Sequence, residues 1–346
     1  MLLSAGITFL SLLSTTYAQD LSVSTSWKKF SNTRLLAERI KVSQDAIDNI
    51  LPQLNVATGE FNSRRWAQAA ISAYRAYEDF DLLVHAIATW NHVTEFVITG
   101  AQVNAKTNPR KNFPIADSCE GATMAGGVFW ISNRTTSDEQ SINSITTGFI
   151  DASTFALLAE IIRDAKYKNA AILSAQWIKA HNINSNKIIL DSVNSHDCSR
   201  SPSTWIFTYN SGKYIEGLSV VSDITGDAQW RGSMLEIIAA AVKSTKWQGA
   251  DGIITEGASP NDNNDGVGFK SIYLRGLSEA FGRNPSNTNF RILLHKYIDV
   301  QYNALLDLAV TGSSYSSRWN GPPQAFTTWV QLTALDILGS AIIANN

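Results

Sequence analysis

Apolar residues recur at helical spacing along most of the chain, and segments with strand-like alternation are few. In residues 228–243, for example, Trp230, Met234 and Ile237 fall on one stripe of a helix. The pattern therefore predicts an all-α fold for the 346-residue chain. Ten helices are expected, at residues 31–53, 62–77, 80–98, 144–163, 167–181, 210–224, 228–243, 268–282, 287–306 and 325–343.

The connections between these helices alternate in length. Short connections are predicted near 78–79, 164–166, 225–227 and 283–286, and long ones at 99–143, 182–209, 244–267 and 307–324. A short turn joins two antiparallel helices into a hairpin. When hairpins stack side by side, the short turns lie at one end and the long connections at the other. Because long loops in a compact domain are usually functional, we expect one site at the long-loop end.

The hairpins also resemble one another in sequence. Residues 73–90, 157–177 and 218–237 each end one helix, turn over an acidic residue and begin the next helix on an aromatic residue or leucine. A repeat of this length and type implies a solenoid or a closed toroid. The helices at 144–163 and 210–224 are rich in small residues and apolar on more than one side, which favours a toroid of inner and outer helices.

The N-terminus has the pattern of a secretory signal peptide. Residues 2–13 are apolar, and small side chains precede a cleavage site after Ala18. We expect a secreted protein without a membrane anchor, in which residues 19–346 form one domain. Cys119 and Cys198 are then expected to pair, the alternative being two free buried thiols. Asn133 begins an Asn-Arg-Thr sequon and is a predicted glycosylation site.

Composition narrows the class of ligand. Charged residues make up only 17% of the chain and the net charge is −2, which gives no basic field for nucleic acid or anionic membrane. Ten Trp, ten Tyr and fourteen Phe suit neutral, hydroxyl-rich ligands, although most of them are expected in the core. The five histidines are scattered, and the acidic run at 261–266 lacks the distal Glu of a calcium loop. No metal or cofactor is predicted.

Four motifs resemble glycoside hydrolase family 76, the family of α-1,6-mannanases and related fungal cell-wall proteins. They are residues 119–130 (CEGATMAGGVFW), 208–212 (TYNSG), 224–227 (ITGD) and 269–276 (FKSIYLRG). The resemblance runs from about residue 66 to the C-terminus. It implies an (α/α)6 barrel that binds α-mannan, and a monomer is expected. By this resemblance, Trp130, Tyr209 and Asn210 line the sugar cleft. Four further residues are predicted to contact substrate: Trp66, and Thr147, Phe269 and Lys270 at the starts of helices that follow long loops.

The chain departs from this family at the residues expected to be catalytic. Glycoside hydrolysis normally uses two carboxyl groups, and the family carries adjacent aspartates shortly before a Trp. The corresponding pair before Trp66 is Asn62-Ser63 or Phe61-Asn62, and neither contains an aspartate. Carboxylates elsewhere in the long connections, such as Glu256, are expected to be solvated loop charges rather than replacements. The catalytic residues therefore stay unassigned.

The helix count falls short in the same region. The family fold has twelve helices, whereas ten are predicted here, and only one precedes residue 62. An absent internal segment of about 50 residues would explain both deficits. Two functions remain open: a secreted hydrolase or transglycosidase of cell-wall mannan, or a non-catalytic relative that binds mannan or is too incomplete to fold well.

Overall fold

The described part of the chain is built almost entirely of helices. The computed structural model describes residues 19–50, 63–132, 137–148, 154–258 and 265–346. The α-helices in these ranges are α1 (Leu36–Ile50), α2 (Ser63–Tyr77), α3 (Phe80–Val93), α4 (Gly100–Ala105), α5 (Ser144–Thr146), α6 (Ala156–Ile162), α7 (Ala165–His181), α8 (Thr208–Thr225), α9 (Ala228–Ala241), α10 (Phe269–Arg283), α11 (Thr288–Leu308) and α12 (Thr328–Ala344).

Most of the predicted helices are confirmed, with two differences. The predicted helix at 144–163 contains α5 and α6, and residues 149–153 between them lie outside the described residues. Helix 80–98 ends at Val93 and is followed by a 3-10 turn at Thr94–Phe96. Helix α4 lies inside a connection that was expected to be irregular; Thr99 begins it with a capping box. Before α2, the described residues contain α1 alone.

The short turns share one construction, which explains the sequence repeat. A residue with positive φ ends the first helix in three of them: Glu78 (56°), Arg163 (62°) and Gly226 (70°). An aspartate follows each, at 79, 164 and 227, and its side chain accepts a hydrogen bond from the backbone N–H two residues further on. The left-handed residue ends one helix and the aspartate caps the next, so the chain reverses within two residues.

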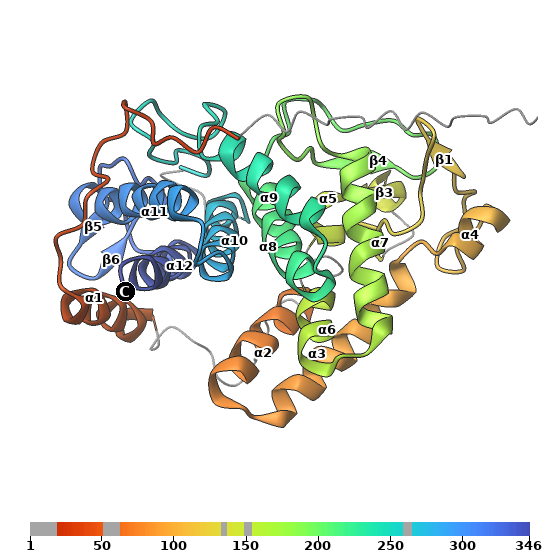
Figure 1. Cartoon of the computed structure of the whole chain (residues 1–346), viewed down its shortest axis with the longest axis horizontal. Helices are drawn as coiled ribbons and strands as arrows, with labels where there is room; N and C mark the ends of the chain where they lie inside the picture. Colours follow the sequence, from red (N-terminus) through yellow and green to blue (C-terminus); the bar gives the residue numbers. More distant parts are fainter. Residues whose placement is uncertain (1–18, 51–62, 133–136, 149–153, 259–264) are drawn as a thin grey trace, which may run out of the picture.

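Helices α8, α10 and α12 form an inner layer. Helix α10 packs against both α8 and α12, while α9 lies beside α8 and α11 beside α12 (Figure 1). All residues from Thr208 to Ser222 in α8 are buried, which confirms the prediction that this helix is surrounded by others. Helix α1 packs against α12, so the N-terminal and C-terminal helices are neighbours.

The β-structure in the described residues is limited to short antiparallel pairs within the long connections. These pairs are β1 (Ser118–Cys119) with β2 (Ala122–Thr123), β3 (Ser141–Asn143) with β4 (Ser192–Asn194), and β5 (Val310–Thr311) with β6 (Ser314–Tyr315). The β3–β4 pair joins two different long connections, so these loops are fastened to each other.

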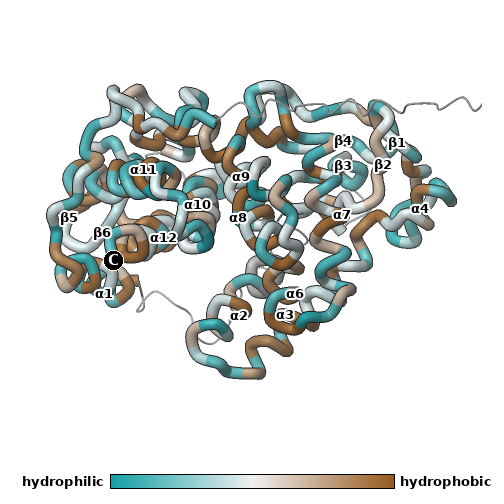
Figure 2. The backbone as a smooth tube through the Cα atoms, viewed as in Figure 1, coloured by the Kyte–Doolittle hydropathy of each residue, from teal (hydrophilic) through white to brown (hydrophobic). Residues whose placement is uncertain are grey.

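Hydrophobic and hydrophilic positions are mixed along most of the chain (Figure 2). Among the described residues, no helix is long and apolar enough to cross a membrane. The predicted signal peptide, residues 1–18, lies outside the described residues.

Candidate functional site

Contacts between successive long connections join them at one end of the helices. A disulfide between Cys119 and Cys198, whose Cα atoms are 5.5 Å apart, links connections 99–143 and 182–209 and confirms the predicted pairing. The backbone N–H of Thr208, at the end of connection 182–209, donates to Glu256 at 2.9 Å. Lys270 then donates to the carbonyl oxygens of Glu256 and Ser317, in connections 244–267 and 307–324. Figure 1 shows connections 182–209 and 244–267 along the upper edge.

A group of aromatic side chains lies at the first turns of α8 and α10. The rings of Tyr209 and Phe269 are stacked, with centroids 4.1 Å apart and planes 15° from parallel. Phe207 packs against both rings, at 5.7 and 5.4 Å. We call Phe207, Tyr209 and Phe269 the aromatic platform. Phe207 and Phe269 are half-buried, and the neighbouring Trp205 is 48% exposed, so the platform reaches the surface.

A buried carboxylate holds the start of α8. Asp191 accepts hydrogen bonds from the Tyr209 hydroxyl (3.1 Å), the Asn210 amide (3.1 Å) and the Asn143 amide (3.0 Å). Burial, reinforced by Asp191, raises the pKa of Tyr209 well above its ordinary value, so this phenol stays a hydrogen-bond donor. Oδ1 of Asn210 is buried and has no protein partner, which leaves one unused acceptor in this cluster.

Glu256 and Lys270 form a second polar group beside the platform. The carboxylate of Glu256 also accepts a hydrogen bond from the Thr208 hydroxyl, and the ammonium of Lys270 lies 4.7 Å from the centre of the Trp319 ring. Burial raises the pKa of Glu256 to about 7 against the opposing effects of Thr208 and Lys270. Burial likewise lowers the pKa of Lys270 to about 7. Glu256 is thus not the solvated loop charge that was expected.

A third polar cluster lies inside the ring of helices. Lys213 of α8 is fully buried and pairs with Glu216 one turn later, at 2.5 Å. Gln68 of α2 bonds to both, accepting from the ammonium and donating to the carboxylate. Burial lowers the pKa of Lys213 to about 8, although Glu216 opposes the shift. Because its ionic groups are paired and hydrogen-bonded, this cluster fastens α2 to α8.

The remaining residues predicted to contact sugar have different surroundings. Trp130 is 36% exposed. Thr147, Asn210 and Lys270 are fully buried, and the Thr147 hydroxyl accepts a hydrogen bond from the backbone N–H of Val128 at 3.1 Å. Direct contact of these three with a sugar stays a prediction; in this structure they hold the loops that carry the platform and Trp130.

Several predicted positions cannot be placed. Asn62 and Asn133 lie outside the described residues, and Ser63 and Trp66 are described only as part of the backbone of α2. Elsewhere on the loops, the carboxylates of Asp117, Glu120 and Asp197 are exposed on the surface. No group of three or more potential metal-ligating side chains (His, Cys, Asp or Glu) occurs within the described ranges.

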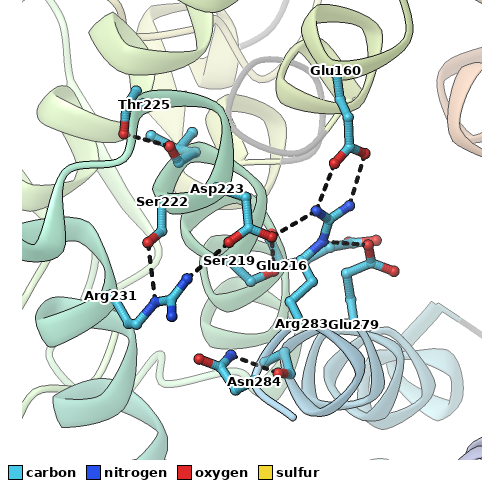
Figure 3. A network of polar contacts seen from close by, with 12 residues as sticks. Glu160, Glu216, Ser219, Ser222, Asp223, Thr225, Arg231, Glu279, Arg283 and Asn284 are labelled. Atoms are coloured by element: carbon cyan, nitrogen blue, oxygen red, sulfur yellow. Dashed lines mark hydrogen bonds and ion pairs between the residues drawn. The ribbon is translucent and has the colours of Figure 1, made fainter. Parts of the chain in front are cut away.

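The opposite end of the helices is held by an ion-pair network centred on Arg283. Its guanidinium contacts Glu160 of α6 (2.7 Å), Asp223 of α8 (2.9 Å) and Glu279 of α10 (2.8 Å) (Figure 3). Burial disfavours the charge, but the three carboxylates hold the pKa of Arg283 above its ordinary value. Two cavities of about 410 and 390 Å³ open at this end and contain none of the predicted sugar-contacting residues. The network fastens three helices at the end away from the platform.

Asp191 and Glu256 were not assigned a role from the sequence. Both follow aliphatic residues inside otherwise polar connections, Ile188-Ile189-Leu190 and Ile253-Ile254 respectively. These aliphatic residues are buried or half-buried and draw the adjacent carboxylate inward. An acidic residue directly after an apolar run, or one residue beyond it, within a long loop is the signal that could have identified them.

The profile of the family described as glycosyl hydrolase family 76 matches residues 112–345, more than half of the chain. The chain belongs to glycosyl hydrolase family 76. The matched range contains the disulfide, the aromatic platform and the Arg283 network. Comparison with curated proteins found no match.

Solved structures with the same fold include members of family 76. An inactive variant of the α-1,6-mannanase GH76A of Salegentibacter sp. HEL1_6, with two consecutive aspartates replaced by asparagine, was solved with α-1,6-mannotriose. It is 18% identical, with 88% of this chain and 87% of that chain covered and a TM-score of 0.68. Dfg5 from Chaetomium thermophilum, solved with glucosamine, is 13% identical, with 92% of each chain covered and a TM-score of 0.62. These matches confirm the expected toroid of helical pairs.

Proposed function

We propose that this chain is an exported protein that binds α-mannan at the aromatic platform and has little or no hydrolytic activity. The observation that carries the proposal is the platform itself, at the end where the long connections meet. The C–H faces of a sugar can lie on flat aromatic rings, and Trp205 and Trp130 add exposed aromatic surface. The polar groups beneath, on Asp191 and Asn210, hold the start of α8 in place.

The ligand class is inferred from family membership and from the solved relatives. The structure of the Salegentibacter enzyme was solved in complex with α-1,6-mannotriose and with α-1,6-mannotetrose, in both cases as inactive variants with two consecutive aspartates replaced. In that enzyme, binding therefore survives the loss of the aspartates. By the resemblance, the equivalent pair in this chain is Asn62-Ser63 or Phe61-Asn62, and neither pair contains an aspartate. This supports binding without efficient hydrolysis.

The second candidate is a hydrolase or transglycosidase of the same polysaccharide, which family membership favours. It requires two carboxyl groups at the bound sugar. Two carboxylates lie beside the platform, and both already accept hydrogen bonds from neighbouring groups. Asp191 accepts from three side chains, and Glu256 accepts from the backbone N–H and the hydroxyl of Thr208. The second candidate therefore has no free pair of carboxylates among the described residues around the platform.

Calorimetric titration of the purified protein with α-1,6-mannotetraose tests the proposal, with reducing-sugar release measured in parallel. We expect saturable binding, none to β-1,4-mannotetraose, and no release above background. Phe269→Ala should weaken binding by about tenfold, as expected for one lost aromatic contact. Phe30 lies outside the platform and is 39% exposed, so Phe30→Ala removes an aromatic ring and should leave binding unchanged.

The outcomes separate the two candidates. Absence of binding would overturn the proposal, and release of shorter oligosaccharides by the unmodified protein would establish the second candidate. Asn62→Asp combined with Ser63→Asp should introduce hydrolysis if these positions match the family's aspartates. A folded, mannan-binding double variant that releases no sugar would show that the positions do not match.

A further inference from the structure

The spacing of the stacked pair depends on how the first turns of two neighbouring inner helices are held. Tyr209 follows Thr208 at the start of α8, and Phe269 precedes Lys270 at the start of α10. Their rings lie 4.1 Å apart, so a small change in either turn alters the surface presented to a ligand. Glu256 contacts both turns.

The contact with α8 is made by the Glu256 side chain. The residue before α8, Phe207, has no side chain that can cap the helix. The Glu256 carboxylate supplies the cap from another loop, because it accepts hydrogen bonds from the Thr208 backbone N–H (2.9 Å) and the Thr208 hydroxyl. A carboxylate at this position also has a favourable interaction with the helix dipole.

The contact with α10 is made by the Glu256 backbone. Its carbonyl oxygen accepts a hydrogen bond from Lys270 Nζ at 2.9 Å. The same ammonium donates to the Ser317 carbonyl and lies over the Trp319 ring, and Lys270 is fully buried. The contact of Glu256 with α10 is therefore buried and made by its backbone, whereas the contact with α8 depends on its carboxylate.

We propose that Glu256 is a positioning residue, which sets the stacked Tyr209–Phe269 pair by bridging the first turns of α8 and α10. It touches no sugar and acts through Thr208 and Lys270. Its effect on affinity rests on the proposed mannan binding, whereas its effect on the geometry of the platform does not.

The bridge is expected to respond to pH. Three titratable groups interact electrostatically with Glu256. Lys270 of α10 lowers the pKa of Glu256, and Glu256 in turn raises the pKa values of Tyr209 of α8 and Tyr297 of α11. With a pKa of about 7, Glu256 loses its proton as the pH rises from 5.5 to 8. The ionised form accepts both bonds from Thr208, whereas in the protonated form one oxygen carries a hydrogen. Lys270 also has a pKa of about 7 and loses a proton in the same interval, but its neutral amine keeps two N–H groups for its two carbonyl partners. The change at Thr208 therefore sets the sign, and affinity should increase with pH across this interval.

Two substitutions separate positioning from stability. Glu256→Gln keeps an acceptor for the Thr208 N–H and a donor for its hydroxyl, so it should bind α-1,6-mannotetraose within about threefold of the unmodified protein, without the pH response. Glu256→Ala should bind at least tenfold more weakly at every pH. Glu279→Ala, at the opposite end of α10, removes an ion pair to Arg283 and should leave affinity and its pH response unchanged.

Titrations at pH 5.5, 7 and 8 give the affinities, and hydrogen exchange of residues 207–210 and 268–271 gives a readout that needs no ligand. Faster exchange in Glu256→Ala but not in Glu279→Ala supports the bridge. Unchanged exchange together with unchanged affinity and pH response in Glu256→Ala would overturn it. If the unmodified protein binds no mannotetraose, the proposed function fails and exchange alone decides whether the bridge holds the platform.

Discussion

Gly276 of α10 and Gly212 of α8 form a close approach between two inner helices, and Gly276→Ala tests that packing directly. A Cβ atom at Gly276 would lie 2.1 Å from the Gly212 carbonyl oxygen and 2.8 Å from its carbonyl carbon. A Cβ atom at Gly212 would lie 2.4 Å from Cα of Tyr273. Both clashes are with backbone, so no side-chain rotation relieves them, and the helices must separate.

The size of the effect follows from that separation. Ordinary van der Waals contact begins at about 3.4 Å, so α8 and α10 would have to move apart by about 1 Å. Overpacking of a core typically lowers the free energy of unfolding by about 1–3 kcal/mol. The better helix propensity of alanine offsets about 1 kcal/mol of this loss. We expect a net loss of about 0–2 kcal/mol in the free energy of unfolding. Because Tyr209 and Phe269 begin these two helices, the aromatic platform should widen as well.

Urea-induced unfolding at 25 °C, followed by circular dichroism, measures the loss. Gly232→Ala on α9 is the matched control, since a Cβ atom there has nothing within 4 Å. It should stabilise the protein by about 0.5–1 kcal/mol through the helix preference of alanine. If Gly276→Ala is as stable as Gly232→Ala, the two inner helices do not meet at their glycines and this account of the ring is wrong.

Three further predictions concern other parts of the fold. Arg283→Met removes the cation shared by three partly buried carboxylates and leaves Glu160 without its ion pair, so it should lower the free energy of unfolding by about 1–3 kcal/mol. Arg231→Met, at a more exposed ion pair, should cost less than about 1 kcal/mol; equal losses in urea unfolding would contradict the network. Cys198→Ser opens a bridge between residues 79 apart and should destabilise by up to about 4–5 kcal/mol; an unchanged melting temperature would refute this. The pKa of Lys213 is about 8 in the folded protein and about 10.5 when unfolded, so the unfolded chain holds more protons between these values and stability should rise from pH 8 to pH 10. Urea unfolding at each pH should show no such rise in the stability of Lys213→Met, whereas the exposed control Lys246→Met should show it. The same dependence of stability on pH in both variants would exclude Lys213 as the cause.

The helical hairpins were predictable because their signals are local. An acidic residue between two amphipathic segments marked the turns at 78–79, 164–166 and 225–227, and the structure shows why: each aspartate caps the helix that it precedes. The disulfide was predictable for a different reason, since two cysteines in an exported chain have few alternatives.

The polar contacts around the platform were only partly predictable. The motif around Tyr209 and Phe269 identified the right helix starts, but their stacking depends on contacts between distant segments. Glu256 reaches Thr208 across 48 residues, and Asp191 reaches Asn210 across 19. Irregular loops have no period from which such contacts can be read, and a buried carboxylate looks the same in sequence as an exposed one. The buried hydrogen bond of Lys213 could not be predicted for the same reason, because its partner Gln68 lies on another helix.

The hypothesis of an absent helical pair stays a prediction, and the packing of α12 gives it a physical basis. Helix α12 is apolar on all sides, as expected for an inner helix. Its neighbours include α10, α11 and α1, yet Leu332 and Ile343, three turns apart on one face, are 41% and 50% exposed. A further inner helix against that face would bury both side chains. The sequence places the deficit between α1 and α2, where the aspartates are also absent, so a single deletion would remove the helices and leave the catalytic positions without carboxylates. The platform is carried by α8 and α10, outside that interval, and would remain intact. Binding without hydrolysis is therefore the expected behaviour.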